Sequence, residues 1–124
     1  MASLQVRNLM TASVISVGPD ASIGQVHDLM IRNRIRHVPV IDAKGRVLGV
    51  VSERDVLQRV FFEDTGKVTD IMAWKTQTIE ADDPVANAAR IMLDHKYGCL
   101  PVVDHGRLTG ILTEADFVRH LSEG

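Results

Sequence analysis

The chain repeats one pattern twice, and this repetition constrains the fold more than any other feature of the sequence. Residues 6–60 align with residues 68–121, with a single deletion in the second copy. The strongest matches are HVPVID with CLPVVD and GVVSERD with GILTEAD, which begin at His37, Cys99, Gly49 and Gly110. Because an internal duplication determines the architecture, we expect two similar units related by a pseudo-two-fold axis, with any site present twice.

Length and charge limit the class of protein. A chain of 124 residues has the size of one compact domain, and each repeat of about 55 residues would be marginal alone. We therefore expect the two repeats to share one core. We take residues 6–60 as repeat 1, residues 61–67 as a linker and residues 68–121 as repeat 2. The net charge of −2 gives no electrostatic reason to expect a nucleic acid partner.

The sequence contains no targeting or membrane signal. No apolar stretch approaches the roughly 18 residues of a membrane span, and no signal peptide opens the chain. The single cysteine, Cys99, excludes an intrachain disulfide framework and is typical of a reducing compartment. The sequence therefore predicts a cytoplasmic protein that does not bind a membrane.

Hydrophobic spacing predicts a mixed α/β (α+β) fold in which each repeat has the order β-α-β-β-α after a short helical lead-in. In the first repeat the lead-in is expected at residues 6–10, and the five elements at 14–17, 23–31, 37–41, 47–51 and 53–60. In the second repeat the five elements are expected at 76–79, 84–95, 99–103, 108–112 and 114–121. Pro39 lies inside the expected strand and cannot donate to a ladder, so it predicts either an edge strand or the entrance of a strand.

The chemistry concentrates where the third strand of each repeat meets its last helix. Both repeats have a glycine, two aliphatic residues, a hydroxyl residue, two further residues and an aspartate, ending in SERD at 52–55 and TEAD at 113–116. A hydroxyl at a helix start is a ready phosphate contact, and an aspartate one turn later suits the paired hydroxyls of a ribose. The same pattern is also a capping box, in which the acid only closes on the cap residue's own N–H. Two copies at equivalent positions favour the binding interpretation.

These linked signatures resemble a tandem pair of CBS domains, the cystathionine-β-synthase-type repeat that is also called a Bateman module. The resemblance covers residues 6–121 and rests on Leu9-Met10-Thr11, the HVPVID segment and the duplicated Gly-aliphatic-aliphatic-Ser/Thr-x-x-Asp endings. It implies a regulatory fold that binds adenosine-containing ligands, namely AMP, ADP, ATP, NAD or S-adenosylmethionine, in two clefts between the repeats. It also implies a homodimer, in the form of a flat disc of four repeats.

In similar proteins each cleft takes the first strand and the start of the second strand from one repeat and the Ser/Thr-x-x-Asp from the other. Carried onto this sequence, the first cleft combines Thr11, Val14, Ile35, Arg36 and His37 with Thr113 and Asp116. The second cleft combines Ala73, Thr76, Tyr97, Gly98 and Cys99 with Ser52, Arg54 and Asp55. The resemblance implies that the aspartates hold the ribose, the hydroxyl residues hold the phosphate, and backbone groups with aliphatic walls hold the adenine.

The two clefts are not equivalent by sequence. The guanidinium groups of Arg36 and Arg54 are the expected anion contacts, and the alternative for each is a solvated surface charge. Arg36 becomes Gly98 in the second repeat, and Arg54 becomes Ala115. Tyr97 either lies against an adenine or belongs to the rim of the core. We therefore expect unequal occupancy of the clefts, without a direction that the sequence alone can supply.

Catalytic and metal sites are not indicated. The histidines show no spacing typical of a metal site, and neither a nucleophile with its base nor a glycine-rich phosphate loop can be assembled. The predicted function is a ligand-sensing module for signal transduction that is not an enzyme, requires no cofactor and acts on an unidentified regulated protein. The alternatives are a dimeric scaffold protein with vestigial clefts and the regulatory part of a larger enzyme or transporter.

The outer helices are expected to form the dimer interface. They carry more aliphatic surface than one pair of repeats can cover, and contiguous apolar surface of this kind usually marks an interface. The residues concerned are Leu29, Ile31, Val56, Val60, Ile91, Leu93, Val118 and Leu121.

Overall fold

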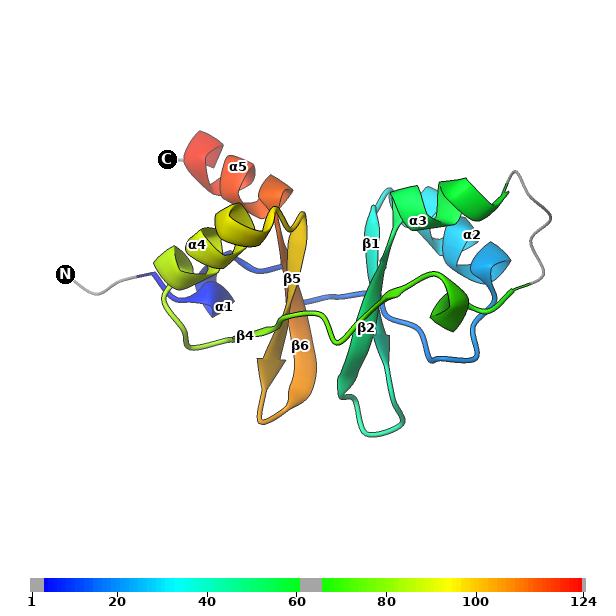
Figure 1. Ribbon diagram of the computed structural model, residues 1–124. Coiled ribbons are helices and arrows are strands. Elements are labelled where there is room, and N and C mark those ends of the chain that lie inside the picture. Colours follow the sequence, from blue (N-terminus) through cyan, green and yellow to red (C-terminus); the bar gives the residue numbers. More distant parts are fainter. Residues whose placement is uncertain (1–3, 61–65, 124) are drawn as a thin grey trace. The chain divides into compact units, whose positions relative to one another are not determined.

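A computed structural model describes residues 4–60 and 66–123 of the chain (Figure 1), so most of the predicted linker at 61–67 lies outside the described residues. The helices are α1 (Val6–Leu9), α2 (Ile23–Asn33), α3 (Glu53–Val60), α4 (Val85–His95) and α5 (Glu114–Glu123), with a 3-10 turn η1 (Val68–Asp70). The strands are β1 (His37–Ile41), β2 (Val47–Ser52), β3 (Ala73–Trp74), β4 (Ile79–Glu80), β5 (Cys99–Asp104) and β6 (Arg107–Thr113). The predicted mixed α+β fold with two repeats is confirmed. No helix within the described residues is long and apolar enough to cross a bilayer.

Local signals set the ends of the first long helix in each repeat. Ser22 precedes α2 and accepts a hydrogen bond from the Gln25 N–H at 3.0 Å, as expected of an N-cap. The residue after α2 is Arg34 and the residue after α4 is Lys96, and both adopt the left-handed conformation, with φ of 54° and 56°. A left-handed residue at this place stops a helix and satisfies its last carbonyl groups. The chain then leads directly into β1 or β5.

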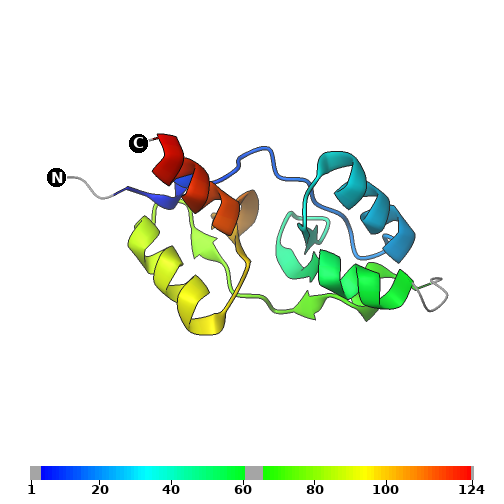
Figure 2. The ribbon, with the colours of Figure 1, turned by 90° about the horizontal axis from the view of Figure 1, so that it is seen from above.

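The chain divides into two compact units whose boundaries differ from those of the repeats. Unit 1 consists of Met1–Val14 together with Gln77–Gly124, and unit 2 consists of Ile15–Thr76. Each unit therefore contains the long helices and the hairpin of one repeat and the lead-in of the other. In unit 1 the exchanged lead-in helix α1 lies beside α5 (Figure 2).

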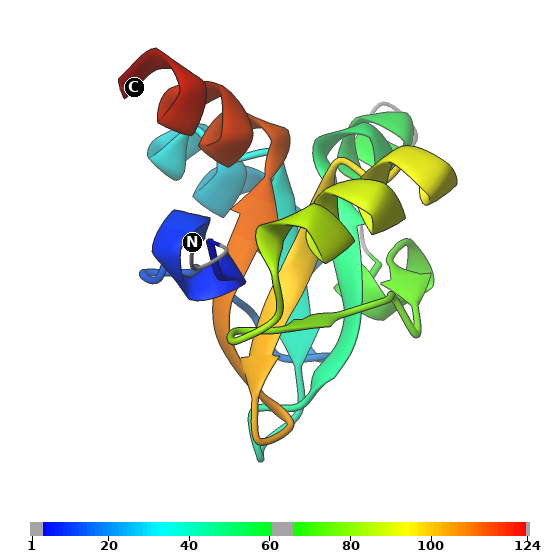
Figure 3. The same ribbon diagram turned by 90° about the vertical axis from the view of Figure 1, so that its left-hand side faces the viewer.

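Each unit has a three-stranded sheet with its helices on one face. The sheet of unit 2 has the order β1-β2-β3 and is antiparallel, whereas in unit 1 the order is β4-β5-β6, with β4 parallel to β5. Figure 3 shows α1 and α4 in front of the hairpin of β5 and β6. In both units the exchanged lead-in pairs with the second strand of the hairpin. Ala73 pairs with Val50 of β2, and Thr11 pairs with Ile111 of β6.

A glycine in β2 and another in β6 permit this close pairing. A Cβ at Gly49 would lie 2.2 Å from the carbonyl oxygen of Ala73. A Cβ at Gly110 would lie 2.6 Å from the sulfur of Met10 and 3.0 Å from the carbonyl oxygen of Thr11. A side chain at either position would push the lead-in away from the strand, since glycine in a strand marks a close backbone approach. The duplicated glycine of the motif therefore places each lead-in beside the start of the last helix.

The prediction of one shared core is wrong, because each unit has its own hydrophobic cluster. The repeats share segments instead: Val6 and Leu9 of the first lead-in are buried in unit 1, and Val68 and Met72 of the second are buried in unit 2. Because a unit of about 60 residues is marginal alone, the exchanged lead-in supplies buried side chains that the rest of the unit lacks. The other buried members are Ile79, Ala81, Ala88, Met92, Leu100, Val102 and Leu112 in unit 1, and Ile23, Val26, Met30, Val38, Val40, Val51 and Val56 in unit 2.

The first strand of each repeat is shorter than predicted. Residues 14–17 form no strand, and only Val17 makes an isolated parallel bridge with Val40. The corresponding strand of the second repeat is β4, which begins at Ile79 instead of Thr76. The chain turns toward the next helix after one or two paired residues, so no longer ladder forms. The edge position predicted for Pro39 is confirmed for the β1-β2-β3 sheet, and its carbonyl accepts the Val17 N–H at 3.1 Å.

Candidate functional site

The duplicated motif places an aspartate in the first turn of the last helix of each unit. In unit 1, Thr113 ends β6 and Asp116 lies in α5. The Thr113 N–H donates to Asp116 Oδ2 at 2.8 Å, and the Thr113 hydroxyl donates to the same oxygen at 3.2 Å. Asp116 is 1% exposed, and it is the only buried charged residue in the part of the chain that the structure describes.

Two further groups contact the other oxygen of the Asp116 carboxylate. The Thr11 hydroxyl donates to Oδ1 at 2.9 Å, and the Arg119 guanidinium forms an ion pair with the same atom. Thr11 belongs to the lead-in that pairs with β6, and Arg119 lies one turn further along α5. A carboxylate offers about four acceptor positions, so the four donors from these three residues satisfy Asp116 completely.

In unit 2 the equivalent carboxylate has fewer partners. The Ser52 N–H and hydroxyl donate to Asp55 Oδ2 at 3.0 and 2.8 Å, and the Asp55 N–H donates to the Ser52 oxygen at 3.1 Å. Oδ1 of Asp55 has no hydrogen bond to any other described residue. The side chain is half-buried, in contrast to that of Asp116. Asp55 therefore keeps one oxygen open.

Two substitutions between the repeats explain this difference. Thr11 corresponds to Ala73, which has no hydroxyl, and Arg119 corresponds to Gln58, which has no charge. The main chain of the two lead-ins pairs with the last strand in the same way. The difference between the two carboxylates therefore comes from side chains alone. The sequence motif did not point to Arg119, although its place three residues after Asp116 is a spacing at which helix side chains meet.

The capping interpretation of the motif is confirmed in its local geometry. In both units the acid accepts the N–H of the hydroxyl residue three positions earlier, which is the contact that closes a capping box. In unit 2 the reciprocal bond from the Asp55 N–H to the Ser52 oxygen is present as well. This cap occupies only Oδ2 of Asp55, so it does not compete with a ligand at Oδ1.

Other predicted site residues gather at the start of α3 in unit 2. The first N–H of α3 donates to the Arg36 carbonyl at 2.7 Å, and His37 is the strand partner of Ser52. Ile35 is half-buried and packs against the core of the unit. The side chains of Arg36 and Arg54 are exposed, so both guanidinium groups are accessible to an anion.

The same arrangement recurs at the start of α5 in unit 1. The first N–H of α5 donates to the Gly98 carbonyl at 3.4 Å, and Cys99 is the strand partner of Thr113. The Tyr97 ring stacks on His95, with a centroid distance of 5.1 Å and an angle of 12° between the rings. His95, Tyr97 and Gly98 thus lie in the segment that leads from α4 into β5.

Val14 and Thr76 lie where the chain leaves the two lead-ins. Val14 is half-buried, and the Thr76 hydroxyl donates to the Ala73 carbonyl at 3.1 Å. The predicted pairing of residues 35–37 with Asp116, and of residues 97–99 with Asp55, would join residues of different units. That pairing stays a prediction.

The single cysteine has no reactive environment. Cys99 is 4% exposed, and burial raises the pKa of its thiol to about 12, so the thiol is protonated at neutral pH. It behaves as a small apolar residue, as buried free cysteines commonly do. Among residues 4–60 and 66–123, no group of three or more His, Cys, Asp or Glu side chains could hold a metal ion.

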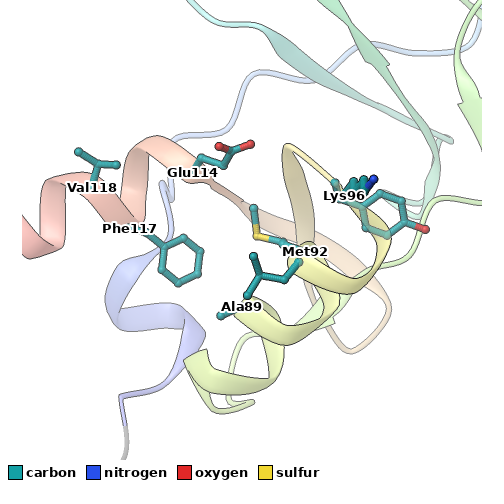
Figure 4. Close-up of a pocket in the computed structure, with 8 residues that line it drawn as sticks. Ala89, Met92, Lys96, Glu114, Phe117 and Val118 are labelled. Atoms are coloured by element: carbon teal, nitrogen blue, oxygen red, sulfur yellow. The ribbon is translucent and has the colours of Figure 1, made fainter.

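A groove of about 510 Å³ separates α4 from α5 (Figure 4). Met92 and Leu93 of α4 line one side, Phe117 and Val118 of α5 line the other, and the remaining lining residues are Ala89, Lys96, Tyr97 and Glu114. Leu93 and Val118 are 79% and 65% exposed. In unit 2, by contrast, α2 packs directly on α3.

The predicted apolar helix surface is found only in part. Ile31, Leu93, Val118 and Leu121 are exposed, and Leu57, which the sequence had not indicated, is exposed as well. Val56 is fully buried in the core of unit 2, so its assignment to the outer surface is wrong. The reason is the helix phase, which turns this side of α3 toward the sheet. Leu29 and Ile91 are half-buried, and the side chain of Val60 lies outside the described residues.

Comparison with known sequences shows a family match to both repeats. The CBS domain family matches residues 6–61 and 68–123. Inosine-5'-monophosphate dehydrogenase of Mycobacterium leprae is 37% identical over 89% of this chain and 21% of the dehydrogenase. This chain spans only 21 to 33% of the length of four curated relatives, this dehydrogenase among them.

Solved structures give the same result over nearly the whole chain. CBSX2 of Arabidopsis thaliana, solved in complex with AMP, is 30% identical with a TM-score of 0.85, over 96% of each chain. A CBS domain pair solved with 5'-methylthioadenosine and S-adenosyl-L-methionine is 25% identical with a TM-score of 0.87, over 95% of this chain and 99% of that chain. Since the family match covers both repeats, this chain belongs to the CBS domain family and carries two CBS domains.

Proposed function

We propose that the chain is a regulatory, ligand-sensing module that binds an adenosine-containing ligand through Asp55 and Asp116. The observation that carries this proposal is the duplicated placement of a carboxylate beside a hydroxyl residue at the start of a helix. The complex of CBSX2 with AMP, at 30% identity, supports the ligand class. The candidate ligands are AMP, ADP, ATP, NAD and S-adenosylmethionine, and the module itself is not an enzyme.

Each group in this site has a chemical task. A carboxylate has two acceptor oxygens, so it can accept hydrogen bonds from both neighbouring hydroxyls of a ribose. Ser52 and Thr113 lie at helix starts, where free N–H groups and the helix dipole favour a phosphate. The exposed guanidinium groups of Arg36, in the first predicted cleft, and of Arg54, in the second, each add a charge-assisted contact to the phosphate bound in that cleft.

Occupancy becomes a signal through a shift between two states of the module. A ligand can shift such an equilibrium only by its difference in affinity for the two states. The lead-ins are suited to this role because each belongs to the compact unit formed mainly by the other repeat. A ligand that contacts a lead-in therefore acts on a segment that the chain connects directly to the other unit.

Thermal unfolding in the presence of each candidate ligand tests the proposal. A ligand at 100 times its Kd stabilises a one-site protein by about 2.7 kcal/mol, which raises the Tm measurably. Asp55→Ala and Asp116→Ala are each expected to weaken binding at their own site about ten- to a hundredfold, as measured by calorimetry. Asp82→Ala, at an exposed aspartate outside the motif, is the matched control. Unchanged affinity in the double variant, with only lower stability, would leave the motif as a pair of caps and favour the scaffold function.

We also propose that a second copy of the chain occupies the groove between α4 and α5. The groove is apolar, and Leu93, Val118 and Leu121 stand exposed beside it, which is the surface that a helix-mediated dimer would cover. Light scattering is expected to give about twice the chain mass of 13.7 kDa. Leu93→Glu is expected to yield monomers, whereas Trp74→Glu, at an exposed residue of β3, is expected to leave the dimer intact. A monomeric wild-type chain would contradict this assignment.

A further inference from the structure

The two candidate ribose carboxylates differ in how many acceptor positions they have left. Asp116 accepts two hydrogen bonds at Oδ2 from Thr113 and two contacts at Oδ1 from Thr11 and Arg119, which fills the roughly four positions of a carboxylate. Asp55 accepts both of its hydrogen bonds at Oδ2, from Ser52. Within the described residues its Oδ1 is open.

We propose that Thr11 and Arg119 act as a latch on Asp116, so that the Asp55 site binds ligand first and the Asp116 site binds only after the latch opens. This inference rests on the proposed function and adds an order of occupancy and its cause. A ribose can reach Oδ1 of Asp55 directly. At Asp116 the ribose hydroxyls must displace the Thr11 hydroxyl, the Arg119 guanidinium or both.

The ribose can displace both latch side chains because each of these residues is at least partly exposed to solvent. The Arg119 side chain is 51% exposed, so its guanidinium can return to water. Thr11 is an exposed residue of the lead-in, held beside β6 by its backbone pairing with Ile111. Loss of one hydrogen bond to an ionised group lowers an affinity by about tenfold or more, so the two sites are expected to differ by at least that factor.

Opening of the latch couples ligand to the fold. Thr11 joins the lead-in of repeat 1 to α5 of repeat 2 through Asp116, and this contact is lost when a ribose takes its place. Ala73, at the equivalent place in unit 2, makes no such contact because it has no hydroxyl. The Asp116 site therefore changes a contact between two repeats on binding, whereas the Asp55 site does not.

A titration of the wild-type chain with AMP, followed by amide NMR, tests the order directly. The Ser52 and Thr113 N–H groups donate to Asp55 and Asp116, so their resonances report the two sites separately. The Ser52 resonance is expected to reach half of its shift at an AMP concentration at least about tenfold lower than the Thr113 resonance. Simultaneous shifts, or an earlier shift of Thr113, would overturn the latch while leaving the proposed function standing. No shift at either amide with any of the five ligands would overturn both.

Exchanging the latch between the repeats provides the matched variants. Thr11→Ala with Arg119→Gln gives Asp116 the surroundings of Asp55, and we expect the two half-shift concentrations to approach one another. Ala73→Thr with Gln58→Arg offers Asp55 the same latch, and we expect the Ser52 shift to move about tenfold or more toward higher AMP. Spectral dispersion equal to that of the wild type shows that each variant is folded. Weaker AMP binding at Thr113 after removal of the latch would mean that Arg119 serves the ligand and would reject the inference.

Discussion

Asp55 and Asp116 occupy the same position of the same motif, yet their carboxylates have different surroundings. Both close a cap on the hydroxyl residue three positions earlier. Only Asp116 is also held by a lead-in hydroxyl and by an arginine, because Thr11 and Arg119 are replaced by Ala73 and Gln58 in the other repeat. The comparison teaches that the motif determines a local cap, whereas residues outside the motif determine whether the carboxylate is available.

The lead-ins show a second contrast between the units. Both pair with the strand that carries the motif glycine, but the atoms closest to that glycine differ. At Gly49 the nearest neighbour is the carbonyl oxygen of Ala73, which belongs to the backbone of a paired strand. At Gly110 it is the sulfur of Met10, near the end of a flexible side chain. A new Cβ would therefore meet a backbone atom first in unit 2, whereas in unit 1 it would meet a movable side chain first and the Thr11 carbonyl oxygen at 3.0 Å next.

The largest expected effect follows from this difference in the glycine surroundings. Gly49→Ala places a Cβ 2.2 Å from a backbone oxygen, so β3 must move, and we expect a loss of about 3 kcal/mol or more in the free energy of unfolding. Gly110→Ala is expected to cost less, about 1–2 kcal/mol, because the Met10 side chain can rotate away and the Thr11 carbonyl oxygen at 3.0 Å has to move only slightly. Urea unfolding measures both values. Gly18→Ala, where a new Cβ meets no atom within 4 Å, is the control, and equal losses at 49 and 110 would contradict the contrast.

The second prediction compares the stability effects of the two aspartates. Asp116→Ala leaves Thr11, Thr113 and Arg119 without their acceptor, and we expect a loss of about 2–3 kcal/mol. The half-exposed Arg119 regains water, which keeps the loss below that of a fully buried ion pair. Asp55→Ala removes only a cap and is expected to cost about 1 kcal/mol. Chemical unfolding of both variants without ligand measures the difference, and a larger loss for Asp55→Ala would show that the extra contacts of Asp116 do not stabilise the fold.

Much of the local structure could be predicted from the sequence. Periodicity and caps placed the long helices and the hairpins to within a few residues, as the comparison of 84–95 with α4 (Val85–His95) shows. The pattern could not predict the length of the strand expected at 14–17, because the same residues fit either a single bridge or a longer ladder. Periodicity could not predict the exchange of lead-ins, since the choice of the unit on which α1 packs is a tertiary decision. Only the family resemblance grouped Thr11 with Thr113 and Asp116.

Residue spacing predicted the local pairs of the site, whereas the contact of Thr11 with Asp116 was expected only from the family resemblance. Ser52 with Asp55 and Thr113 with Asp116 were found because each pair lies within one helical turn. The role of Arg119 was missed, since an arginine on an exposed helix face has no distinguishing pattern of its own. Its partner is recognisable only once Asp116 is known to be buried.

The third prediction concerns Cys99, which corresponds to the half-buried His37 in the other repeat. Burial raises the pKa of the folded thiol to about 12 from 9.0, so only the unfolded chain loses this proton between those values. Stability from this group is therefore complete below pH 9 and decreases by roughly 1.4 kcal/mol per pH unit above it. At pH 10.5 we expect wild type to have lost about 2 kcal/mol more than Cys99→Ala, relative to pH 8, in urea unfolding under reducing conditions. Parallel pH profiles for the two proteins would show that the thiol is not shielded.

The smallest effect is expected at the hairpins, where the two repeats differ by one residue. Asp42 accepts the N–H groups of Arg46 and Lys44 and pairs with the Arg46 side chain, and the backbone hydrogen bond from Arg46 is the main cause that lowers the pKa of its carboxyl below 3.8. The contribution of Asp42 to stability is thus complete above its unfolded pKa of about 3.9 and is lost as the pH falls through the folded value. In the shorter hairpin, Oδ1 of the corresponding Asp104 instead lies 3.0 Å from Nδ1 of His105.

Amide exchange at low pH measures this contrast between the hairpins. As the pH falls through the lowered pKa of folded Asp42, protonation weakens its bonds to the Lys44 and Arg46 N–H groups, so the protection of these amides is expected to fall relative to that at pH 6. Asp42→Asn retains an acceptor oxygen but cannot titrate, so its protection at these two amides is expected to change little over the same range. Equal acid sensitivity in the wild type and in Asp42→Asn would show that the hairpin opens for another reason. A loss of protection confined to the wild type would identify the Asp42 carboxyl as the acid-sensitive group of this hairpin.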